Sequence, residues 1–347
     1  MADVTILGAG IFGLSIAFAC QSRGAMVRVI DPGGAGAGAS GGIVGALAPH
    51  VPENWNEKKA FQLDSLLAAE AFWKDVARVS GLPPGYARTG RVQPVADEAA
   101  LSLARQREGT ARELWGERAT WQVVEAGSVR HAPVTPTGLL ILDTLSARLH
   151  PREACKALAT AIARRGGEIL TEGTPQGRVV HATGVAGLSE LSQKLGAPVG
   201  NGVKGQGAVL SFAAPEAPQI FADALHVIFH ANGTTAVGST SERDYASPTG
   251  TDAQLDDILA RARVAVPALR DAKVIERWAG VRPRARSRAP MLGAHPLCDG
   301  QFIANGGFKI GFGMAPKVAE VMADLVLDGR DAIPEAFRPE ASLPKPG

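Results

Sequence analysis

The sequence predicts an α/β protein in which a Rossmann-like dinucleotide-binding domain is joined to a second, mainly antiparallel β-sheet domain. The first observation is an apolar strand at residues 4–7 that runs directly into the glycine motif Gly8-Ala9-Gly10-Ile11-Phe12-Gly13. A helical stretch and a second apolar strand, residues 27–30, follow and end at Asp31, which completes a βαβ unit. The other observations are a group of short apolar segments between residues 209 and 237, and a length of 347 residues, which exceeds one typical domain.

The glycine motif predicts that the first domain binds a dinucleotide. Gly8 permits a tight turn, Gly10 lets the backbone approach a pyrophosphate, and Gly13 lets the helix pack closely on the strand. The amino end of the helix offers free N–H groups to the anion. Asp31 lies 23 residues after Gly8, where a carboxylate accepts a hydrogen bond from a ribose hydroxyl and disfavours a 2′-phosphate, so FAD or NAD is favoured over NADP. The alternative is a glycine turn in an ordinary α/β protein.

The composition narrows the class of ligand. Lys and Arg number 36 against 34 Asp and Glu, a net charge of +2, so the strongly basic surface of a nucleic-acid or anionic-membrane protein is not expected and a small molecule is favoured. The three cysteines stand far apart without a CxxC pair, which predicts neither a disulfide framework nor a metal site and fits the cytoplasm. No secretion signal is expected, and the longest apolar stretches fall short of the roughly 20 residues that cross a bilayer.

The remaining elements follow from periodicity and from residues that begin or end helices. Residues 32–42 form a glycine-dense loop, which either brings backbone N–H groups to a flat cofactor or is a flexible linker. Apolar residues at three- and four-residue spacing predict a long helix over residues 60–79, and Pro151 predicts the start of another, which Gly166-Gly167 ends. Further strands are predicted at residues 90–95, 139–142, 168–170, 178–182, 209–212, 227–229, 235–237 and 301–304, and further helices at residues 98–114, 252–266 and 314–327.

The order of these elements predicts that the first domain is discontinuous, because its first and last segments pack together. Residues 1–85, 139–200 and 283–335 then form the cofactor-binding domain, and residues 86–138 and 201–282 form the substrate-binding domain. A second glycine turn, Ala182-Thr183-Gly184, follows the strand at residues 178–182. The carboxyl ends of strands are where open α/β sheets bind ligands, so this turn is expected beside the dinucleotide.

Several further motifs follow the opening glycine motif in a fixed order. They are Gly38-Ala39-Ser40-Gly41-Gly42, Gly45-Ala46-Leu47-Ala48-Pro49-His50, Leu149-His150-Pro151, Val180-His181-Ala182-Thr183-Gly184, Val203-Lys204-Gly205-Gln206-Gly207, Val237-Gly238-Ser239-Thr240, Trp278-Ala279-Gly280-Val281-Arg282-Pro283 and Gly306-Gly307-Phe308-Lys309-Ile310-Gly311, the last leading to Ala315-Pro316. Each motif alone is weak evidence, but the ordered set covers most of the chain. It resembles the D-amino-acid oxidase, glycine oxidase and sarcosine oxidase family of FAD-dependent amine oxidoreductases, and glycine oxidase most closely.

The resemblance implies an FAD-binding first domain. The FAD is expected to be noncovalent, because no cysteine stands where sarcosine oxidases attach their flavin. The helix that starts near Gly313 would point its positive end at the flavin ring, where reduction develops negative charge. Contacts to FAD are expected at Gly8, Gly10, Ile11, Phe12, Gly13, Asp31, Ala39, Ser40, Gly45, Ala182, Thr183, Gly184, Gly307, Phe308, Lys309, Ile310 and Gly311.

The resemblance also implies a substrate site in the second domain. The residue matching Arg282 grips a substrate carboxylate, for which a planar guanidinium is well suited, and Lys309 adds a less directional charge on the same side of the flavin. The alternatives are an ordinary ion pair for Arg282 and, for Lys309, a solvated lysine or one that assists the reaction of the flavin with oxygen. His226 and His50 are expected to gate the pocket or tune the protonation of the substrate amine, although an ordinary hydrogen-bonded histidine fits either position equally well.

The implied activity is oxidation of a small amino acid or N-methyl amino acid, of the glycine, sarcosine or D-amino acid type, to an imine by hydride transfer to flavin. Oxygen or a quinone would accept the electrons, and a homo-oligomer is left open. Two rivals remain: an FAD-dependent tRNA wobble-uridine side-chain oxidoreductase, whose FAD domain the loop at residues 39–49 also resembles, and a flavin-binding subunit with little turnover. The run Arg284, Arg286 and Arg288 departs from the family pattern and indicates a more anionic substrate, a partner surface or a solvated loop.

Overall fold

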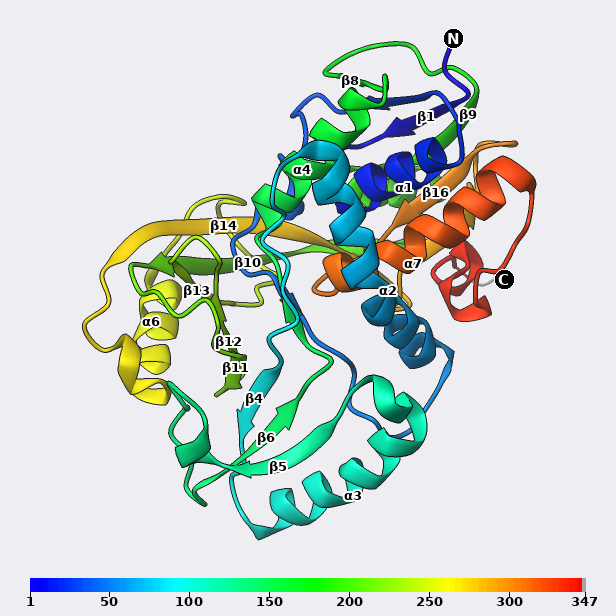
Figure 1. Cartoon of the computed structure of the whole chain (residues 1–347). Coiled ribbons are helices and arrows are strands. Elements are labelled where there is room, and N and C mark those ends of the chain that lie inside the picture. Colours follow the sequence, from blue (N-terminus) through cyan, green and yellow to red (C-terminus); the bar gives the residue numbers. More distant parts are fainter. Residues whose placement is uncertain (345–347) are drawn as a thin grey trace.

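The computed structural model describes residues 1–344 and contains two large sheets in separate parts of the molecule (Figure 1). The first is a six-stranded sheet in the order β15-β16-β9-β1-β2-β8, in which every pairing is parallel except that of β15 with β16. Its strands are β1 (Val4–Leu7), β2 (Val27–Ile30), β8 (Glu168–Leu170), β9 (Arg178–His181), β15 (Met291–Ala294) and β16 (Phe302–Asn305).

Helices cover this sheet and bury the largest hydrophobic core, which includes Leu14, Trp73 and Phe337. α1 packs against α7 and α4, and α2 packs against the same two helices. α5 lies elsewhere, against β10, β14 and β16. The bounds are α1 (Ile11–Ser22), α2 (Glu57–Ser80), α4 (Pro151–Arg164), α5 (Gly184–Leu195) and α7 (Gly311–Ala323).

Glycines allow the opening βαβ unit to pack this closely. Gly8 has φ +107°, in the region that favours glycine, and a Cβ there would lie 2.3 Å from the carbonyl oxygen of Ala182. A Cβ at Gly13 would lie 1.9 Å from the carbonyl oxygen of Gly8. The roles predicted for these two glycines, a tight turn and close packing of helix on strand, are therefore confirmed by the geometry.

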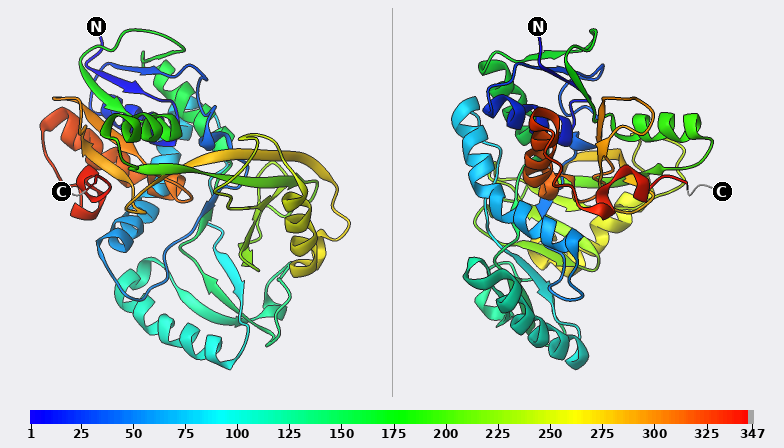
Figure 2. Two further views of the ribbon diagram at one scale, coloured as in Figure 1. Left: turned by 180° about the vertical axis from the view of Figure 1, so that it is seen from behind. Right: turned by 90° about the vertical axis from the view of Figure 1, so that its right-hand side faces the viewer.

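The second sheet has eight strands in the order β14-β10-β13-β12-β11-β4-β6-β5 and is antiparallel except where β11 pairs with β4. α6 (Ala253–Ala265) packs on β10, β12 and β13, and α3 (Glu98–Trp115) packs on β5. Figures 1 and 2 show this sheet and its two helices below the first domain. The strands are β4 (Arg91–Pro94), β5 (Trp121–Glu125), β6 (Leu139–Asp143), β10 (Gly200–Leu210), β11 (Gln219–Ala222), β12 (Leu225–Phe229), β13 (Thr235–Gly238) and β14 (Val274–Ala285), and a separate pair is formed by β3 (Ala46–Leu47) and β7 (Ala147–Arg148).

The element that sequence patterning failed to predict is the long ribbon of β10 and β14. Their register pairs Gly200 with Ala285 and continues to Leu210 with Val274. Glycine occupies β10 at positions 200, 202, 205 and 207, which hides the apolar alternation of a strand, and the prediction at residues 209–212 caught only its end. α5 and the strands β3, β5, β7, β11 and β15 were also not predicted. The closing helix begins at Gly311, earlier than expected, and changes to a π-helical turn at residues 324–328.

Strand β6 requires a correction to the predicted domain boundaries. Residues 139–143 were assigned to the first domain, but β6 lies between β4 and β5 in the eight-stranded sheet. The division that we now propose follows the sheets and places residues 139–145 in the second domain. β14 likewise keeps residues 283–285 with that sheet. Among the described residues, no helix is both long enough and apolar enough to span a membrane.

Candidate active site

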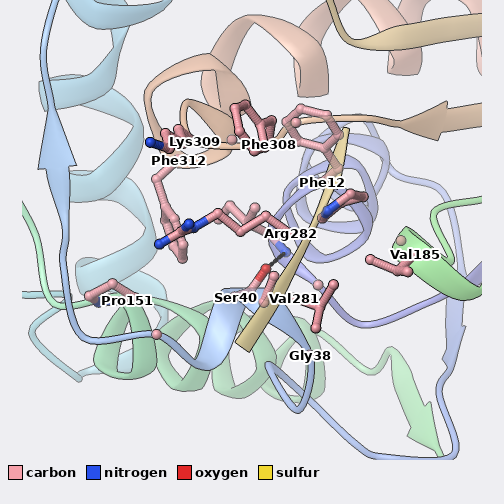
Figure 3. Close-up of a pocket in the computed structure, with 18 of the residues that line it drawn as sticks. Phe12, Gly38, Ser40, Pro151, Val185, Val281, Arg282, Phe308, Lys309 and Phe312 are labelled. Atoms are coloured by element: carbon pink, nitrogen blue, oxygen red, sulfur yellow. Dashed lines mark hydrogen bonds between the residues drawn. The ribbon is translucent and has the colours of Figure 1, made fainter. Parts of the chain in front are cut away.

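A cavity of about 380 Å³ lies where the two domains meet. Five segments supply most of its wall: the β1–α1 turn, the loop after β2, the turn after β9, residues 278–283 of β14, and the segment from β16 into α7. Residues of α4 and β10 and the residue after β13 complete it, namely Pro151, Gln206, Gly207 and Ser239. Figure 3 shows the side chains of these segments converging on one space. The predicted site residues that line it are Gly10, Ile11, Phe12, Asp31, Ala39, Ser40, Ala182, Thr183, Gly184, Arg282, Gly307, Phe308, Lys309 and Gly311.

The amino end of α1 faces this cavity with no side chain capping it from the N-cap position, which is Gly10. The Ile11 N–H donates to Ser40 Oγ at 2.9 Å, drawn as a dashed line in Figure 3. A helix amino end has unpaired N–H groups and a positive partial charge, so it attracts an anion such as a pyrophosphate. Gly8 and Gly13 lie behind this surface and shape the turn.

Asp31 is positioned at the end of β2 by two backbone donors. Its Oδ2 accepts from the Ala9 N–H at 2.7 Å and its Oδ1 from the Gly33 N–H at 2.9 Å. A carboxylate has about four acceptor positions, so this side chain can still accept hydrogen bonds from a ribose. Asp31 also lines the cavity, as the ribose assignment requires.

The glycine-dense loop is folded, which argues against the flexible-linker alternative. The Gly36 N–H donates to the Ala9 carbonyl at 2.8 Å, and residues 39–41 form a 3-10 turn. A Cβ at Gly42 would lie 3.3 Å from the indole of Trp278, so the loop packs directly against β14. Ile43 and Val44 continue the loop along the cavity wall.

The turn after β16 brings the start of α7 to the wall of the cavity. Phe308 has φ +45°, a strained value for a residue with a side chain, and its N–H donates to the Pro283 carbonyl at 3.0 Å. Ile310 is the N-cap of α7 and provides no side-chain cap, so the positive end of the helix stays open beside Gly311. Ile310 itself does not line the cavity, in contrast to the prediction, because it is the residue that turns the chain into the helix.

These residues fit the FAD that the sequence predicts. Two open helix amino ends, of α1 and α7, suit the pyrophosphate and the electron-rich part of a reduced flavin. Asp31 suits the ribose, and the turn at Ala182, Thr183 and Gly184 offers backbone that a flat ring can approach. The Asn305 amide holds this turn by donating to the Gly184 carbonyl at 2.9 Å.

Arg282 extends from β14 into the cavity, as the sequence predicts, and is largely buried. Its Nη2 donates to Ser239 Oγ at 2.8 Å and its Nη1 to the Thr240 carbonyl at 3.3 Å. Burial lowers its pKa to about 10, partly offset by Glu242, so the group stays positive near neutral pH. Within residues 1–344 it forms no salt bridge, because the nearby carboxylate of Glu242 is paired with Lys204 at 3.3 Å. The guanidinium therefore has donors free for a carboxylate from outside the chain.

Two further cations accompany Arg282. In Figure 3 Lys309 lies on the side of the pocket toward which the Arg282 side chain extends. Burial, followed by the charges of Arg282 and Arg284, lowers the pKa of Lys309. Arg284 lies over the Phe308 ring, 5.4 Å from its centroid. Of the three arginines in the run, Arg286 and Arg288 are exposed, so Arg284 alone approaches the site.

The two predicted histidines and Gly45 do not line the cavity. His226 is half-buried on β12, and desolvation followed by the cations Arg91, Lys309 and Arg282 lowers its pKa to about 3, so the ring is neutral and close to the basic cluster. His50 is held by Gln62, which accepts from both its backbone N–H and its ring Nδ1, and this is an ordinary structural contact. Gly45 packs against Leu149, whose carbonyl oxygen would lie 1.8 Å from a Cβ at that position.

Sequence reasoning missed four polar or aromatic residues of the cavity wall. They are Gln206 on β10, Ser239 after β13, Trp278 on β14 and Asn305 at the end of β16. All four lie within or beside motifs that carried the resemblance, so motif position was the available signal. Their chemistry gave none, because serine, glutamine and asparagine occur in any loop or strand edge.

The chain matches one family model and is similar to several known proteins. Residues 3–325 match the family model DAO, described as FAD dependent oxidoreductase. The chain is 28% identical over 378 residues to the bifunctional protein ThiO/ThiG of Synechocystis sp., with 98% of this chain covered but only 54% of that protein, about half its length. It is 26% identical over 373 residues to the glycine oxidase of Pseudomonas aeruginosa, covering 98% and 99% of the two chains. The crystal structure of glycine oxidase from Geobacillus kaustophilus superimposes with a TM-score of 0.84 at 21% identity, over 97% and 98% of the chains.

Proposed function

Because this chain belongs to the DAO family of FAD-dependent oxidoreductases, with FAD as its cofactor, we propose that it oxidises a small amino acid or N-methyl amino acid to an imine. The observation that carries the substrate class is the Arg282 guanidinium, which is buried in the cavity without a carboxylate partner in residues 1–344. A buried charge needs a partner, and a substrate carboxylate supplies one while fixing the orientation of the bound molecule.

The side chains of this site bind and orient, and they do not need to act as a general base. Bound FAD supplies the acceptor for the hydride that leaves the substrate Cα. Arg282 is held on two sides by Ser239 and Thr240, so a carboxylate bound to it is fixed in direction. His226 is neutral and half-buried near these cations, so it does not compete for the carboxylate.

The grouping of Arg282, Lys309 and Arg284 favours a second candidate within the same reaction, a substrate with two carboxylates. Lys309 and Arg284 have no salt bridge within residues 1–344, and the lowered pKa of Lys309 reports mutual repulsion as well as burial. A second carboxylate would relieve that repulsion. The alternative role of Lys309, in the reaction of the flavin with oxygen, stays open beside it.

The proposal also covers the electron acceptor, the attachment of FAD, the assembly and the location of the enzyme. Oxygen or a quinone is proposed as the electron acceptor, FAD as noncovalently bound, and a homo-oligomer as an assembly to be measured. The cytoplasm is the proposed location, supported by three cysteines that form no disulfide.

The test is anaerobic mixing of the purified flavoprotein with glycine, sarcosine, proline, D-alanine and iminodiacetate, following the visible absorbance of the flavin. We expect bleaching by an amine that carries a carboxylate, and Arg282→Met should weaken it while retaining FAD. Arg286→Met is the matched control, since Arg286 is exposed in the same stretch. If Arg282, Lys309 and Arg284 together bind a second carboxylate, iminodiacetate is expected to be the best substrate. Lys309→Met should then slow flavin reduction by iminodiacetate more than flavin reduction by sarcosine.

Other outcomes of this experiment would support one of the two rival functions. A bound flavin that none of these amines reduces, but that a carboxymethylaminomethyl nucleoside does, favours the wobble-uridine oxidoreductase. A flavin that no substrate reduces favours the flavin-binding subunit.

A further inference from the structure

A cluster of two histidines and one cysteine lies outside the cavity. His181, His295 and Cys298 each place a ligand atom within 4.8 Å of the others. All three are half-buried, and none lines the active-site cavity. The spacing of the cysteines along the chain predicts no metal site, so this His–His–Cys cluster is a product of the fold.

The first domain assembles the cluster from two distant segments. His181 is the last residue of β9 and pairs in register with Ile303 of β16. His295 follows β15 directly, and the hairpin loop that joins β15 to β16 carries Cys298 three residues later. β16 is the parallel neighbour of β9 and the antiparallel neighbour of β15. The loop that joins β15 to β16 therefore lies beside His181 at the end of β9.

The loop is held in shape by its own backbone. The His295 N–H donates to the Gln301 carbonyl at 2.8 Å, the Gln301 N–H donates to the Cys298 carbonyl at 3.1 Å, and the Cys298 N–H donates to the His295 carbonyl at 3.4 Å. The backbone of the loop is therefore ordered before any ligand arrives. The Leu297 N–H donates to His295 Nδ1 at 3.2 Å, so an ion bound by this ring would replace that hydrogen bond.

Gln301 also orients the imidazole of His181. The His181 Nε2 and the Gln301 Oε1 are 2.6 Å apart, and since an amide oxygen only accepts, the ring nitrogen donates. The lone pair of His181 then stands on Nδ1. A hydrogen bond of this kind to the second nitrogen of a histidine is the usual support of a metal ligand.

We propose that His181, His295 and Cys298 bind a Zn²⁺ ion. Imidazole nitrogen and thiolate sulfur are the ligands that zinc prefers in proteins, and a mixed nitrogen and sulfur set favours zinc over magnesium or calcium. Zinc bonds of about 2.0–2.3 Å place tetrahedral ligand atoms about 3.3–3.6 Å apart, so half-buried side chains must close in by about 1.5 Å at most. On binding, the sulfur–zinc bond replaces the S–H bond of Cys298 and the proton passes to solvent.

A water molecule supplies the fourth ligand, because the exposed carboxylate of Glu190 on α5 pairs with Lys194 at 2.7 Å and is not one of the clustered ligand groups. The bound ion would tie the loop at residues 295–301 to the end of β9, whose next residues form the cofactor turn at Ala182, Thr183 and Gly184.

The first experiment uses the unmodified holoenzyme, without a histidine tag. After chelator treatment and dialysis, the protein is alkylated with iodoacetamide with and without one equivalent of ZnCl₂, and each cysteine is quantified by mass spectrometry. Cys298 is half-exposed, whereas Cys20 and Cys155 are buried and burial raises the pKa of each to about 12, so they serve as internal unreactive controls. We expect zinc to slow alkylation of Cys298 at least about tenfold; an unchanged rate overturns the proposal.

The second experiment measures zinc affinity by titration calorimetry. We expect one zinc per chain in the wild type and a loss of affinity of at least about tenfold in Cys298→Ser and in His295→Gln. His131→Asn is the matched control, because His131 lies far from the cluster in sequence and has φ +59°, which asparagine tolerates. Equal affinity in wild type and both cluster variants, or an equal loss in His131→Asn, shows non-specific binding and overturns the proposal. FAD content is recorded throughout, so the result is independent of the proposed amine oxidation.

Discussion

The substitution Gly205→Ala tests the role of Arg282 without changing Arg282 itself. Gly205 lies on β10 directly beneath the guanidinium, and a Cβ there would be 2.0 Å from both Nη1 and Nη2. Ordinary contact begins at about 3.4 Å, so the guanidinium must retreat by about 1.4 Å. The clashing atoms are the far end of a flexible side chain, and the strand can keep its pairing with Gly280. The fold should therefore survive.

The expected effect is a loss of about 100-fold in kcat/KM, because a misplacement of about 1 Å in an orienting group costs that much. This corresponds to about 2.7 kcal/mol of transition-state stabilisation. The assay is anaerobic flavin reduction against amino-acid concentration, on whichever amine reduces the wild type. FAD content and thermal midpoint should remain at the wild-type level, because Gly205 does not line the cavity.

Two comparisons would refute this reasoning. In an Arg282→Met background, Gly205→Ala should have almost no further effect, since the displaced group is gone; an equal loss in both backgrounds means the effect does not pass through the guanidinium. Gly109→Ala is the matched control, because a Cβ at that position of α3 meets nothing within 4 Å. It should leave activity unchanged and stabilise the helix by about 0.5–1 kcal/mol.

Three other predictions follow from the same structure. Replacing Asp31 by alanine should weaken FAD binding by about 10- to 100-fold, measured by fluorescence titration of the apoprotein, because a charged acceptor at the ribose is lost. Burial and then the neighbouring arginines lower the pKa of Lys309, so its charge is present below that pKa and is lost as the pH rises through it. The binding of glycolate should therefore begin to weaken at a pH below 10.5, the pKa of an ordinary lysine; Lys309→Arg should remove this part of the pH dependence and leave the titration of Arg282, whose pKa is about 10. Asp143→Ala leaves Arg91 buried without its partner at 2.9 Å and should lower the free energy of unfolding by about 3–5 kcal/mol in a urea titration, whereas Asp257→Ala, which breaks an exposed pair, should cost less than about 1 kcal/mol.

Local signals in the sequence predicted the elements that have strong periodicity or clear ends. The α2 prediction at residues 60–79 agrees with Glu57–Ser80 because its apolar residues recur at three- and four-residue spacing; in the structure Asn56 caps its start and Gly81 ends it with φ +65°. The pairing of strands was not predicted in the same way. The sequence of β6 has the pattern of an ordinary apolar strand. Its place in the eight-stranded sheet depends on the edges that β4 and β5 offer for pairing, and not on residues 139–143 themselves.

For the site, the sequence alone determined the dinucleotide turn, because Gly8, Gly13 and Asp31 act within one contiguous βαβ unit where spacing along the chain fixes spacing in the molecule. The tertiary structure decided everything that depends on distant segments. It placed Arg282 over Gly205 without a salt bridge in residues 1–344, gave His50 and Gly45 structural contacts outside the cavity wall, and brought the His–His–Cys cluster together. Those outcomes depend on strand register and on which buried charges find partners, and neither is set by residues that are neighbours in the sequence.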